Sequence, residues 1–165
     1  MTQTLIVGYG NADRQDDGAA WHVLNGIAEK LGIPLADAPE DGYFPEGRAV
    51  DLWFVLQLVP EMAEEFARYQ RICFVDAHMD TIPEEIRFIP LDDQPTNPSA
   101  LSHNLDPAAC IALTRMIYHS EPEAALLSVR GYHFQFAREL SPETAALVRQ
   151  AVDLLWNWIT QEEQP

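Results

Sequence analysis

The sequence is poor in basic residues. Only 10 lysines and arginines stand against 26 aspartates and glutamates, so the formal net charge is −16 at pH 7. A charge of this sign repels phosphate, which argues against nucleic acid and against an anionic membrane surface as partners. Acidity of this kind commonly serves solubility alone, and it is also compatible with a cationic partner such as a metal ion or a basic peptide.

Cysteines and long apolar runs are also scarce. Cys73 and Cys110 are the only two cysteines and lie in apolar stretches, so we expect buried free thiols rather than a disulfide. No apolar run approaches the roughly 18 residues that span a bilayer. The opening MTQTLIVGYG lacks the basic and apolar regions of a secretory signal. We therefore expect one cytoplasmic domain, residues 1–165, with a substantial core.

Familiar catalytic and cofactor motifs are missing as well. The sequence contains no GxSxG elbow, no HExxH pair and no P-loop. The dinucleotide fingerprint GxGxxG fails because Asp13 stands where the third glycine is needed. Neither cysteine has the electropositive surroundings that activate a thiol. These absences leave a nucleophilic hydrolase and a dinucleotide-binding protein without support.

The sequence does contain short apolar runs that alternate with helical patterns. Runs such as TLIVG, ICFVDA and ALLSVR are typical of strands covered on both faces. We expect strands near residues 4–8, 51–57, 72–76, 86–89 and 125–130. Apolar stripes and proline starts predict helices after the first strand, over PEMAEEFARY, after Asp106 and after Ser141. This alternation predicts a three-layer α/β/α sandwich with a mostly parallel, about five-stranded central sheet.

Two stretches are rich in proline, glycine and acidic residues and are predicted to lie on the surface. They are residues 32–50 and residues 90–104. The second is long for a connection within a compact domain, and such loops are often functional.

Polar residues occur at three places where they would follow strands or precede helices. The stretch LIVGYGNADRQDDGAAWHVL predicts a strand, a glycine turn and a helix that begins at Asp16 and Asp17. Asp76 ends the run ICFVDAHMD, which also contains His78, and His103 precedes the helix capped by Asp106. Ligands of open α/β sheets bind beyond the carboxyl ends of the strands, where these residues are expected to meet.

Each of these residues also has a purely structural interpretation. Asp16 is explained by helix capping, and His103 alone by a loop or cap position. The convergence of two carboxylates and one imidazole nevertheless favours a metal site with open positions. Oxygen and nitrogen donors without thiolate suit zinc, nickel, cobalt or manganese.

Taken together, these motifs resemble those of the nickel–iron hydrogenase maturation proteases. GYGNADRQDDGAA, FVDAHMD and SHNLDPAACIAL resemble the three motifs of that family, in order and with compatible spacing. QLVPEMAEEFARYQRICFVDA and LSVRGYHFQFARELSP match one branch of it, so the similarity covers nearly the whole chain. VLQLVPE replaces a common Gly-Gly pair, which indicates a divergent branch.

The resemblance implies an endopeptidase that removes a C-terminal extension from the hydrogenase large-subunit precursor after nickel insertion. Carried over by position, the metal-contacting and catalytic residues are Asp17, Asp76 and His103. Many members have glutamate in place of Asp17. The nickel belongs to the substrate, zinc or cadmium is able to stand in for it, and we expect a monomer. The acidic turn then meets a cation instead of a phosphate.

Three alternatives stay open at this point. Asp16 and His78 are both candidates for the general base of the hydrolytic step. An autonomous metallohydrolase with its own zinc or manganese would use the same residues. A non-catalytic module that binds the nickel site or the precursor is the third possibility.

Overall fold

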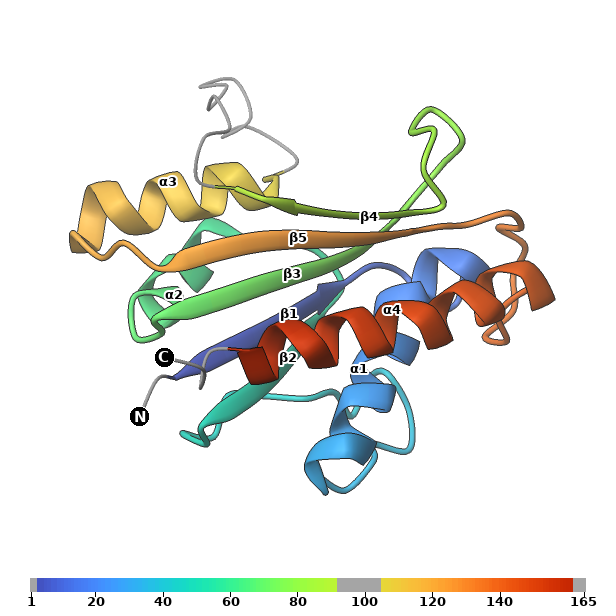
Figure 1. Ribbon diagram of the computed structural model, residues 1–165, viewed down its shortest axis with the longest axis horizontal. Coiled ribbons are helices and arrows are strands. Elements are labelled where there is room, and N and C mark those ends of the chain that lie inside the picture. Colours follow the sequence, from blue (N-terminus) through green and yellow to red (C-terminus); the bar gives the residue numbers. More distant parts are fainter. Residues whose placement is uncertain (1–2, 92–104, 162–165) are drawn as a thin grey trace.

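A five-stranded sheet forms the centre of the molecule (Figure 1). The computed structural model describes residues 3–91 and 105–161. The strand order is β2-β1-β3-β5-β4, with β4 antiparallel to β5 and the other pairs parallel. The strands are β1 (Thr4–Tyr9), β2 (Val50–Val55), β3 (Arg71–His78), β4 (Ile86–Pro90) and β5 (Glu123–Arg130). The predicted five-stranded, mostly parallel sheet is confirmed.

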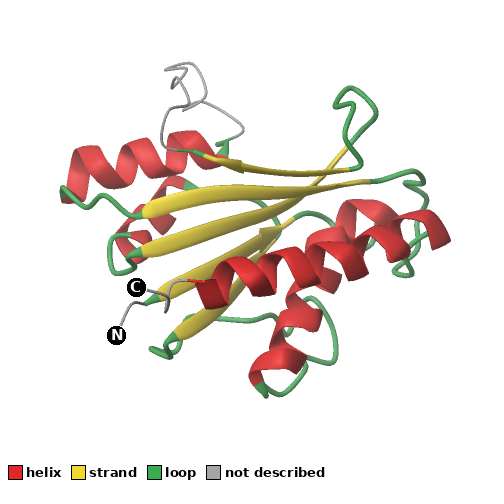
Figure 2. Cartoon of the chain, viewed as in Figure 1, coloured by secondary structure: helices red, strands yellow, loops and turns green. Residues whose placement is uncertain are grey.

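Helices cover both faces of this sheet (Figures 1 and 2). The helices α1 and α4 pack on one face, and α2 and α3 pack on the other. Their bounds are α1 (Ala19–Leu31), α2 (Ala63–Phe66), α3 (Pro107–Tyr118) and α4 (Pro142–Thr160), with 3-10 turns η1 (Gln15–Gly18) and η2 (Pro60–Met62) before α1 and α2. The α/β/α sandwich predicted from the alternating pattern is therefore present.

The central strands are buried on both sides, which explains their continuous apolar sequences. Ile6 and Val75 face α1 and α4, whereas Val7 and Phe74 face α2 and α3. A parallel strand between two helical layers has no solvent side and needs no polar alternation. Both cysteines are buried and free, as predicted.

The predicted helix starts are mostly confirmed. The Asp106 side chain accepts a hydrogen bond from the Ala109 backbone N at 2.7 Å, and Ser141 accepts one from Thr144 N at 3.3 Å. The first helix differs from the prediction. The two aspartates lie in η1, and α1 begins only at Ala19 without a side-chain cap.

Residues 32–49 contain no regular element and Val50 begins β2, but the predicted surface excursion over residues 32–50 is also partly buried. Tyr43 is buried, and its ring lies 5.2 Å from that of Trp21. Its hydroxyl donates to Asn25 Oδ1 at 2.5 Å and accepts from Ala36 N at 3.3 Å. The segment is therefore anchored in the core between α1 and β2.

Replacing Tyr43 with phenylalanine is expected to lower the free energy of unfolding by about 1 kcal/mol, because two hydrogen bonds are lost while the ring packing stays. Urea denaturation measures the change. Phe44→Leu is the control, since Phe44 is 58% exposed and its replacement should have an effect within about 0.5 kcal/mol. Equal stabilities for the Tyr43 variant and the wild type would show that the anchor is the ring alone.

The long connection over residues 90–104 lies mostly outside the described residues, which resume at Leu105. Within the described ranges, no helix has the length and apolar character needed to cross a bilayer.

The order of the strands creates a topological switch point between β1 and β3. From β1 the chain crosses by α1 to β2 on one side, and from β2 it crosses by α2 to β3 on the other. The connections leave β1 and β3 in opposite directions, which opens a crevice at their carboxyl ends. Gly8 lies opposite Val75 in the register, so Tyr9 and Asp76 follow side by side at this crevice.

Candidate functional site

Asp76 is a largely buried carboxylate at the end of β3. Burial and, to a smaller extent, the negative charge of Asp17 raise the pKa of Asp76 from its ordinary 3.8 to about 6. A hydrogen bond from the Ala77 backbone N, at 2.7 Å, and another from the Tyr9 hydroxyl favour the ionised form and oppose this shift. The Tyr9 pKa is itself raised by burial and by Asp76. The buried carboxylate of Asp76 thus has a hydrogen-bonding partner in Tyr9.

Asp17 approaches Asp76 from the turn after β1. Its Oδ2 accepts a hydrogen bond from the backbone N of Asn11 at 2.9 Å, which closes the turn on itself. Gly10 makes this closure possible. It has a φ of 142°, and a Cβ there would lie 2.3 Å from the Asp17 carbonyl oxygen. The glycine of this turn serves close backbone packing that brings a carboxylate to the switch point.

Replacing Gly10 with alanine is expected to lower the free energy of unfolding by about 2–3 kcal/mol, because the strained φ and the collision with Asp17 act together. Gly47→Ala is the matched control. Gly47 also has a positive φ, 81°, but no atom lies within 4 Å of the added Cβ, so only about 1 kcal/mol should be lost. Thermal or urea unfolding compares the two, and equal losses would contradict the close approach at Gly10.

Asp16 is fully buried and does not cap its own helix. Its Oδ2 accepts from Tyr132 N at 2.8 Å, from His133 N at 2.9 Å and from Ser141 Oγ at 2.7 Å. Its Oδ1 accepts from Ser141 N at 2.8 Å. Burial alone would raise the pKa of Asp16, but these hydrogen bonds outweigh it and hold the pKa below 3.8. Asp16 therefore joins the acidic turn to residues 131–141, and its oxygens are not free to accept a proton from water.

His78 is also held in a structural role. Its Nδ1 lies 2.7 Å from Ser128 Oγ and its Nε2 lies 2.7 Å from the Glu84 carbonyl oxygen. Burial lowers the pKa of His78 and favours the neutral ring. With both nitrogens hydrogen-bonded, His78 links β3 to β5 and to the turn before β4. The structure supports neither Asp16 nor His78 as a general base.

His103, the third predicted metal contact, lies outside the described residues. The nearest described part of its segment is the start of α3, where Asp106 and Cys110 both contribute to the raised pKa of Tyr9. The start of α3 thus lies near the Tyr9–Asp76 pair. Among residues 3–91 and 105–161, no three histidine, cysteine or acidic side chains are placed to hold a metal ion together.

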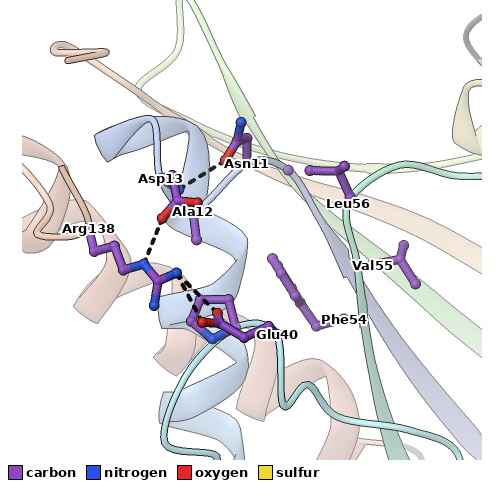
Figure 3. A pocket seen from close by; sticks show the side chains of 10 residues that line it. Asn11, Ala12, Asp13, Glu40, Phe54, Val55, Leu56 and Arg138 are labelled. Atoms are coloured by element: carbon purple, nitrogen blue, oxygen red, sulfur yellow. Dashed lines mark hydrogen bonds and ion pairs between the residues drawn. The ribbon is translucent and has the colours of Figure 1, made fainter. Parts of the chain in front are cut away.

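A pocket of about 250 Å³ opens on the β2 side of the acidic turn (Figure 3). Arg138 lies at its edge, where Nε donates to Asp13 Oδ1 at 2.6 Å and Nη2 donates to Glu40 Oε1 at 3.1 Å. Sequence reasoning did not single out Arg138 or Glu40. No local pattern could have identified this group, because Arg138, Asp13 and Glu40 come from separate segments that only the fold brings together.

The fold and this edge define an α/β sandwich with an acidic switch-point site. No family model matches the chain, and no curated protein gives a significant match to its sequence. Solved structures do match it along almost the whole length. The hydrogenase maturating endopeptidase HybD from E. coli superposes with a TM-score of 0.68 at 15% identity, covering 98% of this chain and 94% of that one.

Two structures from Thermococcus kodakarensis match similarly. The NiFe hydrogenase maturation protease HybD superposes with a TM-score of 0.66 at 17% identity, covering 96% of this chain and 99% of that one. For the maturation protease HycI the TM-score is 0.63 at 20% identity, with 96% and 92% covered. This chain therefore has the fold of the hydrogenase maturation proteases. At the level of the fold, the resemblance predicted from the sequence is confirmed.

Proposed function

We propose that this protein is a hydrogenase maturation endopeptidase. It removes the C-terminal extension of a nickel–iron hydrogenase large-subunit precursor after nickel has been inserted. The observation that carries the proposal is the juxtaposition of Asp17 and Asp76 at the switch point, where the charge of one raises the pKa of the other. The fold shared with maturation proteases supports the same activity.

A cation relieves the unfavourable electrostatics of this pair. Asp76 is desolvated and lies near a second carboxylate, so its ionised form is destabilised without a positive partner. Carboxylate oxygens bind divalent metals. In the proposed complex Asp17 and Asp76 contact the nickel that the precursor carries, and His103 is the third contact expected from the resemblance. Zinc or cadmium would be able to replace nickel.

Hydrogen bonds within the chain orient the two carboxylates for this metal contact. The Asn11 backbone N holds Asp17, while Tyr9 and the Ala77 backbone N hold Asp76. A bound metal with open positions polarises the scissile carbonyl and lowers the pKa of bound water. Water adds to the carbonyl carbon, the amide C–N bond breaks, and the products are a carboxylate on the large subunit and a free amine on the released peptide. Because the metal comes with the substrate, only a loaded precursor is cut.

Intact-mass analysis of a large-subunit precursor, nickel-loaded and nickel-free, tests the proposal. We expect loss of a C-terminal peptide from the loaded form only. Cleavage of both forms by a protein purified with about one equivalent of zinc or manganese would favour an autonomous metallohydrolase. Capture of the loaded precursor without cleavage would favour the non-catalytic binding module.

A further inference from the structure

We propose that the pocket beside the acidic turn binds an apolar side chain of the polypeptide that carries the cleaved bond. The inference rests on the proposed function and deepens it. Gly10 and Asn11 line the pocket, and the backbone N of Asn11 donates to Asp17. The pocket and the proposed metal contact are therefore two sides of the same turn. A chain that presents its nickel to Asp17 has the pocket within reach.

One wall of the pocket is apolar. Ala12, Phe54 and Leu56 line it. Phe54 packs edge-on against Trp21, with ring centroids 5.1 Å apart, so this wall is fixed by the core. Leu56 directly follows β2 and is 66% exposed. An apolar side chain in the pocket would remove part of Leu56 from water as well as itself, which favours binding.

The charged edge of the pocket is paired within the protein and keeps a net negative charge, because one guanidinium faces two carboxylates. Arg138 is bonded to both Asp13 and Glu40. The backbone of Asp13 is also fixed, since its N donates to Asn11 Oδ1 at 3.0 Å and its carbonyl accepts from Ala137 N at 3.0 Å. An anionic side chain entering the pocket would meet this negative edge and would have to compete with Asp13 and Glu40 for Arg138. The arrangement selects an apolar side chain over an anionic one (Figure 3).

The size of the pocket also fits a side chain. Its volume of about 250 Å³ is below the roughly 300–1,000 Å³ that is usual for small-molecule sites. A single large side chain, with the adjoining backbone across the pocket mouth, is the occupant that this space and lining suit.

The test is a charge-exchange experiment on the nickel-loaded precursor. Each of the four residues on either side of the cleaved bond is replaced in turn by aspartate, and kcat/KM is measured with the wild-type protein and with Leu56→Lys. We expect one apolar position where aspartate lowers kcat/KM about 10-fold or more with the wild type. With Leu56→Lys, kcat/KM for the aspartate-substituted precursor should recover several-fold at that position alone. The same variant should cut the unaltered precursor more slowly than the wild type does.

Met116→Lys is the matched control. Met116 is 69% exposed on α3 and does not line the pocket, so this variant adds the same charge elsewhere. Recovery by both lysine variants would reflect net charge only and would overturn the inference. The inference would also be overturned if the wild type cuts the precursor but Leu56→Lys alone rescues no aspartate-substituted position. That outcome would leave the proposed function intact. Failure of the wild type to cut the loaded precursor would overturn the proposed function and this inference together.

Discussion

Replacing Asp76 with asparagine is expected to abolish precursor processing while it stabilises the fold. Loss of a group that merely orients a metal ligand lowers affinity or activity about 10–100-fold, so loss of the ligand charge itself should lower the cleavage rate by at least about 100-fold. The free energy of unfolding at pH 7 should rise by about 2–3 kcal/mol, because burial no longer opposes an ionised side chain. Opposite changes in activity and stability identify a functional group held at a cost to the fold.

The stabilisation should depend on pH in a defined direction. The pKa of Asp76 is raised from 3.8 to about 6 in the folded state. The ionised carboxylate therefore destabilises the protein fully above pH 6, and this penalty disappears as the pH falls through 6 toward 3.8. Urea denaturation at pH 7 and near pH 4 should show the advantage of the asparagine variant at the higher pH and little of it at the lower.

Asp80→Asn is the control for this experiment. Asp80 is an exposed carboxylate four residues further along the chain, so the variant should process the precursor and unfold like the wild type. Normal processing by the Asp76 variant would overturn the assignment of Asp76. An unchanged or lower stability at pH 7 would contradict the unfavourable burial of its charge.

Replacing Asp16 with alanine is expected to have the largest effect on stability, a loss of about 3–5 kcal/mol. The substitution leaves three buried or partly buried backbone N–H groups, those of Tyr132, His133 and Ser141, without their acceptor. Each unsatisfied donor costs about 1–3 kcal/mol, less where water enters. The acidic turn and the start of α4 would separate, so Asp17 would also lose its position.

Denaturant unfolding measures this loss against Asp153→Ala. The Asp153 side chain is 76% exposed and pairs only loosely with Lys30, at 3.9 Å, so its replacement should change the stability by less than about 0.5 kcal/mol. A loss below about 1 kcal/mol for the Asp16 variant would show that water replaces the carboxylate and that the hydrogen bonds add little.

The contribution of Asp16 has the opposite pH dependence to that of Asp76. Its folded-state pKa is below the ordinary 3.8. The stabilisation is therefore fully present above that value and is lost as the pH falls through the folded-state pKa. Wild type and Asp16→Ala should differ most near neutral pH and converge in acid.

The sequence predicted the strands well because buried parallel strands are short, apolar and continuous. TLIVG and ICFVDA became β1 and β3, and the apolar stripe of the last helix is buried along α4 as expected. The prediction was weaker where burial depends on distant partners. Residues 32–50 look polar and proline-rich, yet Tyr43 in their midst is part of the core beside Trp21.

The candidate site divides in the same way. Asp16, Asp17 and Asp76 were candidates from the sequence, since a carboxylate directly after an apolar strand or a glycine turn is a local pattern, and the choice of Asp17 over Asp16 came from the family resemblance. The sequence did not show how the roles of these residues differ from those of their neighbours. Adjacent residues Asp16 and Asp17 have the same chemistry, but one is fixed by residues 131–141 and the other faces the switch point.

By itself, the sequence determined the strand and helix pattern, the acidic turn and the carboxylate at the end of β3, because each depends on residues close together in the chain. Only the tertiary structure decided that Tyr9 pairs with Asp76 and that His78 is bound on both ring nitrogens. It also decided that Arg138 closes a pocket with Asp13 and Glu40. The physical reason is that hydrogen bonding and desolvation depend on distance in space, and these partners lie up to 125 residues apart in sequence.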